Sequence, residues 1–356
     1  MLKLAMARQQ PQAAESGRRS QRLMHHSQLF YRDSVLRPGW GVLLFLLVLI
    51  AAIATQTLIL VRFAHLRDTP HTLLTPRDCL ANGIMAIAVT VATWVLSTQV
   101  ERRFADYGFR APHPLRNLLG GALAGLALLS ALVLLLHQLG LLVFRGQVLF
   151  GAALQWRLAL EWIGFYALAA FVEESLAHGY LQHTLTRGFA WLLRHYFAAT
   201  SGVRGGFWIA AALLSTVFAL LHQINGGETP LGLLNAALFA LLMAFSLWRT
   251  GSLWWAFGYH AAWDWAQSFL WGVPNSGTLT RDHLFLTEPT GSALRSGGSA
   301  GPEGSLYTLG ALLAGFGILM LLHPRRVYPD LWDEAARDSD ETGKLLPDSD
   351  RTTARS

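Results

Sequence analysis

The chain has 356 residues, of which 53% are hydrophobic and only 14% are charged. Because soluble domains carry about 25% charged residues, this composition excludes an ordinary soluble fold. The net charge of +6 does not indicate a nucleic-acid-binding protein, because the basic residues lie between long apolar stretches and no such binding motif is present. Cys79 is the single cysteine, which excludes an internal disulfide and a multi-cysteine metal site.

The apolar stretches are long enough to cross a hydrocarbon core of roughly 30 Å. The first 38 residues are polar and basic and lack the apolar stretch of a cleavable signal peptide. After them we expect eight spans, at residues 40–61, 80–100, 118–143, 158–185, 207–222, 231–248, 253–271 and 306–322. The sequence therefore predicts an all-α fold, a polytopic transmembrane helical bundle of about eight spans.

The distribution of Lys and Arg between the expected loops tests this number of spans. With eight spans, 21 of the 28 basic residues lie on the side of the two chain ends and seven lie on the opposite side. Basic residues are retained in the cytoplasm next to membrane spans. We therefore expect an integral membrane protein of a bacterial-type inner membrane with both termini cytoplasmic.

Adjacent acids stand inside the fourth expected span, where Glu173 and Glu174 are followed by His178. An ionised acid in the bilayer costs several kcal/mol unless it is paired or hydrated, so intramembrane acids are functional by default. Adjacent helical residues point about 100° apart, so the two acids need different partners. Glu174 and His178 share one helix face. The structural alternative is that both acids are neutral and hydrogen-bonded to neighbouring helices.

Two further polar groups follow, Phe218 to His222 at the end of the fifth span and His260 to Asp264 in the seventh. His222 alone also fits an interfacial histidine. His260 and Asp264 are four residues apart and share a helix face, so they can enter one cavity or join two helices. Carboxylates and imidazoles on three helices are the residue types that activate a water molecule. Neither a His-Glu-x-x-His zinc helix nor a Gly-x-Ser-x-Gly elbow is present.

At these residues the sequence resembles the CPBP intramembrane proteases, the group with CAAX prenyl endopeptidases and bacteriocin-processing or immunity proteins. The family motifs are Glu-Glu-x-x-x-Arg, Phe-x-x-x-His and His-x-x-x-Asn or Asp. They correspond here to Glu173 and Glu174, to Phe218 with His222, and to His260 with Asp264. The resemblance covers about residues 158–272 and implies an intramembrane endopeptidase.

The resemblance also implies roles for individual residues. Glu173, the first Glu of the family motif, would activate the attacking water, and His222 would bind water or metal. His260 and Asp264 would hold the transition state, and the second acid, Glu174, belongs to the same catalytic set. His222 and His260 are the candidate metal ligands, and their imidazoles would suit zinc.

One position departs from the family pattern, because His178 stands where the family has Arg. Arg is always charged and forks onto a carboxylate, whereas His is shorter and titrates near neutral pH. A catalytically inactive homologue that acts as a membrane scaffold or immunity protein is therefore an alternative. A proton-coupled transporter is a second alternative, since intramembrane acids and histidines also form proton relays.

These interpretations divide the chain into six segments. They are a basic cytoplasmic tail (1–38), three scaffold spans (39–150), a CPBP-like catalytic core of four spans (151–275), a flexible loop (276–304), the eighth span (305–323) and a disordered cytoplasmic tail (324–356). We expect the substrate to be a membrane protein or a lipid-anchored peptide. The lipid bilayer is the other expected partner, and nucleic acid is not expected.

Overall fold

The computed structural model describes most of the chain between Phe30 and Tyr328. The described residues are 30–32, 35–63, 73–74, 76–100, 102–110, 113–147, 152–197, 202–225, 227–280, 283–325 and 327–328. The two expected tails therefore lie largely outside the described residues.

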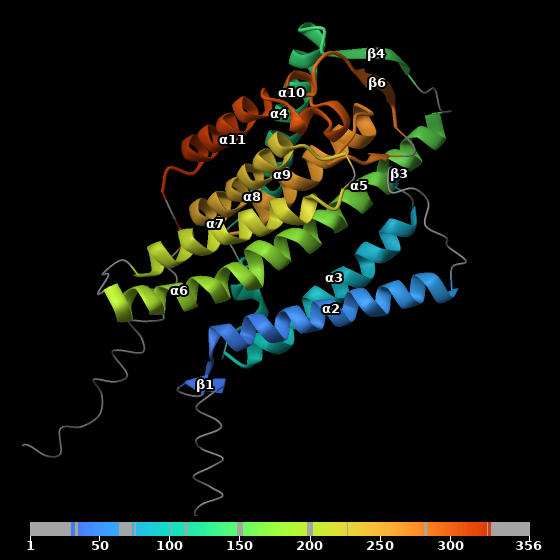
Figure 1. Cartoon of the computed structure of the whole chain (residues 1–356). Coiled ribbons are helices and arrows are strands. Elements are labelled where there is room, and N and C mark those ends of the chain that lie inside the picture. Colours follow the sequence, from blue (N-terminus) through green and yellow to red (C-terminus); the bar gives the residue numbers. More distant parts are fainter. Residues whose placement is uncertain are drawn as a thin grey trace, which may run out of the picture.

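Helices form most of the described structure (Figure 1). The long ones are α2 (Pro38–Phe63), α3 (Pro76–Thr98), α4 (Pro114–Gln138), α5 (Ala152–Glu174), α6 (Gln182–Phe197), α7 (Gly202–His222), α8 (Pro230–Thr250), α9 (Trp254–Trp265) and α11 (Thr308–Leu322). Two π-helical segments, η2 (Ser175–Leu181) and η3 (Ala266–Leu270), follow α5 and α9 directly. The all-α prediction is confirmed.

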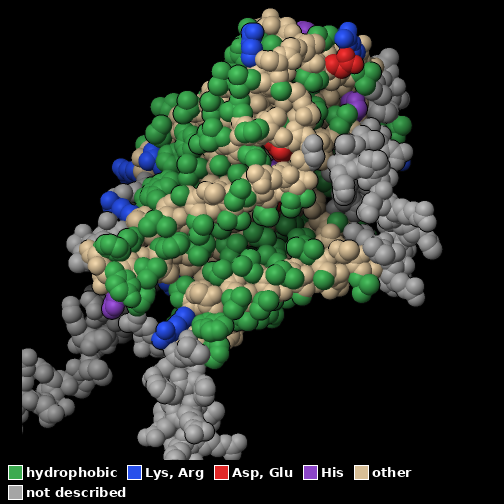
Figure 2. Space-filling model, in the orientation of Figure 1, with side chains coloured by type: hydrophobic (Ala, Val, Ile, Leu, Met, Phe, Trp, Pro, Cys, Tyr) green, Lys and Arg blue, Asp and Glu red, His purple; other side chains and the backbone are tan. Residues whose placement is uncertain are grey.

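Five of the described helices, α2, α3, α4, α7 and α8, are long and apolar enough to cross a membrane. α11 is apolar but shorter. Every expected span coincides with a helix, but the number of crossings stays a prediction. Hydrophobic side chains cover much of the surface in Figure 2, as lipid-facing helices require. Together these features describe an integral membrane protein.

The fourth expected span differs most from its prediction. Helical backbone runs from Ala152 through η2 to Phe197, so it extends well past the expected end at 185. α6 and α7 then pack against each other as a hairpin. In an antiparallel hairpin, residues equally far from the turn lie at the same level. His222, at the end of α7, therefore lies near the level of η2 and Glu174. The Glu-Glu motif and the Phe-x-x-x-His motif thus lie at a similar depth along the helices.

Helix α9 lies between α4, α5 and α8 and carries a ladder of aromatic rings on one face. Trp255 stacks on Tyr259 at 5.0 Å between ring centroids, and Tyr259 stacks on Trp263 at 5.7 Å. These rings are buried against α4 and α11. The polar residues His260 and Asp264 lie on a different face of α9, the one turned toward α5.

Glycines let α4 and α9 approach closely. A Cβ on Gly121 would collide with the backbone of Trp255, one on Gly125 with Tyr259, and one on Gly258 with Leu118. Small residues at helix crossings are the usual way in which membrane helices come into contact. This crossing fixes the height and rotation of α9, and with them the position of His260.

The remaining helices surround this centre. α2 and α3 pack side by side, α3 lies against α5, α2 lies against α6, and α11 covers α4 and α8 (Figure 1). Two short strand pairs lie at the edges, β1 (Tyr31–Arg32) with β2 (Val35–Leu36), and β3 (Leu73–Leu74) with β5 (Leu279–Thr280).

The segment 276–304, expected to be a flexible loop, has regular structure where it is described. It contains β5, β6 (Phe285–Pro289), α10 (Ala293–Ser296) and two short 3₁₀ turns, η4 (Gly298–Ala300) and η5 (Pro302–Gly304). β6 pairs antiparallel with β4 (Leu142–Gln147), and Ala300 is fully buried. Its Gly and Ser residues supply tight turns, and Gly297 and Gly301 adopt positive φ angles.

Candidate active site

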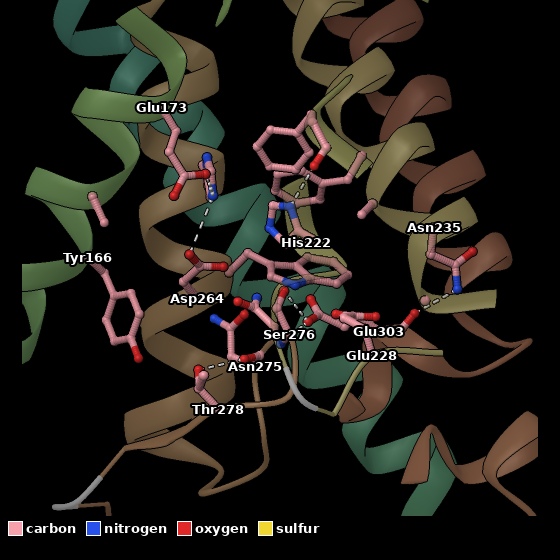
Figure 3. A pocket seen from close by; sticks show the side chains of 18 of the residues that line it. Tyr166, Glu173, His222, Glu228, Asn235, Asp264, Asn275, Ser276, Thr278 and Glu303 are labelled. Atoms are coloured by element: carbon pink, nitrogen blue, oxygen red, sulfur yellow. Dashed lines mark hydrogen bonds and ion pairs between the residues drawn. The ribbon is translucent and has the colours of Figure 1, made fainter. Parts of the chain in front are cut away.

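A cavity of about 190 Å³ lies between α3, α5, α7, α8, α9 and the segment that follows η3 (Figure 3). Four of the five predicted catalytic residues line it, namely Glu173, His222, His260 and Asp264. The structure thus brings together side chains from three helices that are far apart in sequence. Figure 2 shows an acidic patch in the middle of a face that is otherwise largely apolar.

Glu173 is the acid that faces the cavity. Its side chain is 42% exposed, and Oε2 lies 3.7 Å from Nε2 of His260. It stands near the end of α5, where the helix passes into η2. An accessible carboxylate beside an imidazole can hold a water molecule and take its proton.

Glu174 does not line the cavity and is only 2% exposed. One of its carboxylate oxygens accepts a hydrogen bond of 2.8 Å from Nδ1 of His260, and the other accepts one of 2.7 Å from Nδ1 of His178. The acid is thus held by two histidines, one on its own helix and one on α9. Through its hydrogen bond to Nδ1, Glu174 orients the ring of His260.

His178, which stands at the position of the motif's Arg, contacts the carboxylate of Glu174. Its ring is buried, and its Nε2 has no hydrogen-bond partner in the described structure. A single N–H donor therefore replaces the fork of a guanidinium. The second donor to Glu174 comes from His260, so both oxygens of the buried carboxylate are satisfied.

His260 is almost completely enclosed. Its Nε2 lies 3.4 Å from Oδ2 of Asp264, one helical turn later, and the edge of its ring meets Phe239 at 5.0 Å between ring centroids. Because Nδ1 is held by Glu174, Nε2 is the nitrogen that is directed toward Glu173 and Asp264. The hydrogen bond from Nδ1 to Glu174 fixes the rotation of the ring and keeps a hydrogen on Nδ1.

His222 lies in the middle of the cavity in Figure 3, between Glu173 and Asp264 on one side and Ser276 and Glu303 on the other. Its Nδ1 donates to the backbone carbonyl of Phe218 at 2.8 Å, and the two rings lie 4.4 Å apart. Whenever the ring carries a single N–H, this bond leaves Nε2 as an acceptor for a water molecule.

A second acidic pair lies at the other end of the cavity. Glu228 follows α7, and Glu303 lies in η5. Both the backbone N–H and the hydroxyl of Ser276 donate to Oε1 of Glu303. Burial, and after it the charges of Glu228 and Asp264, raise the pKa of Glu303 to about 8. Burial also raises the pKa of Glu228.

Glu228 and Glu303 were not among the residues predicted from sequence. They belong to connections between apolar stretches, where an acid is ordinary, and they are 75 positions apart. The sequence feature that could have indicated Glu228 is its position, because it comes six residues after the motif histidine His222. Tyr166 and Asn235 also line the cavity and carry no motif.

The expected zinc ligands, His222 and His260, offer fewer donors than a catalytic zinc site usually has. Within the described ranges, no three His, Cys, Asp or Glu side chains are grouped as ligands of one metal ion. Catalytic zinc sites have three protein ligands as a rule. Nδ1 of His260 bonds to Glu174 and Nδ1 of His222 bonds to Phe218, so each histidine would offer one nitrogen to a metal ion. Zinc binding by His222 and His260 stays a prediction.

A comparison with family models matches residues 155–266 to the Rce1-like family, described as type II CAAX prenyl endopeptidase Rce1-like. The matched segment includes all five predicted catalytic residues and covers roughly a third of the chain. No curated protein and no solved structure matches the chain. The resemblance to the CPBP proteases is thereby confirmed, since residues 155–266 match the Rce1-like family model.

Proposed function

We propose that the protein is an intramembrane endopeptidase in which the Glu173 carboxylate activates the attacking water. The family whose model residues 155–266 match supports a CAAX-type intramembrane protease in general. The observation that carries the finer proposal is the position of Glu173, with an exposed carboxylate 3.7 Å from Nε2 of His260 in a polar cavity.

In this mechanism Glu173 takes a proton from water while the water oxygen bonds to the carbonyl carbon of the substrate. His222 orients the water, since its Nε2 is free to accept a hydrogen bond while Nδ1 donates to Phe218. In its doubly protonated form, His260 would keep the N–H at Nδ1 on Glu174 and donate the N–H at Nε2 to the developing oxyanion. The C–N bond then breaks, and the proton held by Glu173 passes to the leaving amine.

The proposed substrate is a membrane protein or a lipid-anchored peptide. Its scissile segment must be extended inside the cavity, because helical amides are hydrogen-bonded and cannot be attacked. Polar groups from Asn82, Asn225, Asn275 and Thr278 also line the cavity. They are available to satisfy backbone groups of an unwound segment.

The experiment is cleavage of peptides by the full chain in proteoliposomes. The two substrates are a prenylated peptide with a C-terminal CAAX sequence and the same peptide without the prenyl group. Glu173→Gln should reduce cleavage by about 10²- to 10⁴-fold, the contribution of a general base. Glu161→Gln is the matched control, because Glu161 is an exposed acid on the same helix, paired with Arg157. Unchanged cleavage by Glu173→Gln would overturn the mechanism.

A second candidate is a catalytically inactive homologue, and His178 at the Arg position is the observation that favours it. Comparing the native chain with His178→Arg separates the two functions. Cleavage by the native chain supports the protease. Cleavage by His178→Arg alone would support a protein that has lost the activity.

A further inference from the structure

A second cavity, of about 150 Å³, lies at the opposite end of the helices from Glu303 and is separate from the active site. It is bounded by the start of α4, the end of α8 and the residues that follow α11. Its polar lining consists of His113, Arg116, Asn117, Thr250 and His323, and two apolar side chains complete it. None of these residues belongs to the proposed catalytic set.

Among the described residues, the lining of this cavity is basic and includes no carboxylate. The charge of Arg249, which lies in the last turn of α8, also acts on His323. Burial lowers the pKa of His323, and the charges of Arg116 and Arg249 lower it further. Crowded cationic groups repel one another, so a bound anion would relieve the repulsion.

The start of α4 adds further donors. His113, the residue before the helix, has a left-handed backbone with φ of 55°, and its side chain does not cap the helix. Pro114 has no N–H, and the first turn contains no acidic residue. Asn117 is the residue whose N–H bonds back to the carbonyl of His113. The N–H groups of Leu115 and Arg116 therefore have no acceptor within the helix.

Exposed apolar side chains continue the surface next to the cavity. Leu115 is 64% exposed and Leu119 53% exposed on α4, while Leu321 is 81% exposed and Leu322 56% exposed at the end of α11. A phosphate group in the cavity would thus lie beside a surface that suits hydrocarbon. On the face shown in Figure 2, basic side chains gather at the left end, where α8 and α11 end in Figure 1.

We propose that this cavity binds the phosphate of an anionic phospholipid headgroup, with the acyl chains along the exposed leucines of α4 and α11. The shared chemistry is a phosphate held by Arg116, the two histidines and the free N–H groups of α4. A lipid is favoured over a free phosphate because the basic cavity and the apolar surface are continuous at the helix ends. The proposal does not depend on peptidase activity.

The test measures binding to the purified full chain in detergent by native mass spectrometry and by thermal stability. The three probes are phosphatidylglycerol, phosphatidylcholine and inorganic phosphate. Phosphatidylglycerol should bind in a saturable way and raise the melting temperature, and phosphatidylcholine should bind less. Binding of inorganic phosphate without phosphatidylglycerol would overturn the lipid as occupant. Equal binding of both lipids would overturn recognition of an anion.

Two variants locate the site. Arg116→Gln should weaken phosphatidylglycerol binding about 10-fold, as expected for the loss of one charge-assisted contact. Arg204→Gln is the matched control, because Arg204 is also the third residue of a helix and exposed, but it lies on α7 away from the cavity. Equal effects of the two variants would mean general attraction by basic residues and would overturn the site. His323→Gln serves as an independent variant if Arg116→Gln does not fold.

Discussion

Glu174 on α5 accepts a hydrogen bond from Nδ1 of His260 on α9 at 2.8 Å, while its second oxygen is held by His178 at 2.7 Å. A buried carboxylate thus joins two helices and sets the orientation of the imidazole that faces Glu173. Removing one partner of such a buried group lowers the stability of the fold, because the remaining partner is left without a hydrogen bond. The two adjacent acids therefore have different surroundings, and we expect them to have different roles.

Replacing Glu174 tests this division. In Glu174→Gln an amide N–H₂ takes the place of one acceptor oxygen, so either His260 or His178 must change its tautomer. We expect kcat to fall about 10- to 100-fold, as for other partners that orient a catalytic histidine, with a smaller change in KM. The pH profile of kcat should also move, because the charge beside His260 is lost.

The measurement is kcat, KM and their pH dependence in proteoliposomes, with folding checked by the melting temperature. Glu161→Gln on the exposed face of α5 should leave all of them unchanged. A Glu174→Gln enzyme with the native pH profile and native kcat would show that the contact with His260 is structural only.

Much of this arrangement could be predicted from the sequence. The spacing of four residues between His260 and Asp264 predicts a shared helix face, and their side chains do meet at 3.4 Å. The adjacency of Glu173 and Glu174 predicts different partners, but both acids contact His260, Glu174 at Nδ1 and Glu173 at Nε2. Only Glu174 also contacts His178. Which acid enters the cavity depends on the rotation of α5 against α9. That rotation is set by packing, so periodicity alone could not supply it.

Other features depended on chain connections that the hydropathy pattern does not show. The continuation of α5 through η2 into α6 is not visible as an apolar block, because α6 carries Arg187 and Arg194. Its length is what brings His222 to the level of Glu174. Glu303 reaches the cavity because residues after η3 fold back over it, and such a return depends on long-range pairing of β4 with β6.

Substitutions of two neighbouring glycines should have opposite outcomes. A Cβ on Gly121 would collide with the backbone of Trp255, whereas one on Gly120 has nothing within 4 Å. Gly121→Ala should lower the free energy of unfolding by about 1–3 kcal/mol, as overpacking does, and reduce cleavage by shifting α9. Gly120→Ala should be neutral or slightly stabilising, because Ala favours a helix.

Both variants are compared by thermal unfolding in detergent and by kcat. Equal stability of the two would contradict the close crossing of α4 and α9 as the element that positions His260.

Removal of metal tests the zinc prediction for His222 and His260. The described donors include no group of three that would hold one ion, and the proposed mechanism has Glu173 activate water without a metal ion. We therefore expect cleavage to be unchanged after dialysis against EDTA and after zinc is added back. The measurement is kcat with metal content determined in parallel on the same sample. Loss of cleavage with EDTA and recovery with zinc would contradict this expectation.

The stability of the protein should fall as the pH rises from 4.5 to about 8 because of Glu303. Its folded-state pKa of about 8 lies above the ordinary value of 4.5, chiefly because of burial and then because of Glu228 and Asp264. The neutral form is therefore the one that the fold favours, and this stabilising contribution is present below pH 4.5. It is lost progressively as the pH rises from 4.5, and it is gone above about 8, where the folded protein has ionised an acid beside other carboxylates. Melting temperatures in detergent should fall by several degrees in the native chain between about pH 4.5 and about pH 8. In Glu303→Gln, which stays neutral and keeps an acceptor for Ser276, the fall should be much smaller.

Glu288→Gln is the control, since Glu288 is an exposed acid on β6, paired with Arg145, and should behave as the native chain. If Glu303→Gln and Glu288→Gln lose stability equally with pH, another group causes the loss.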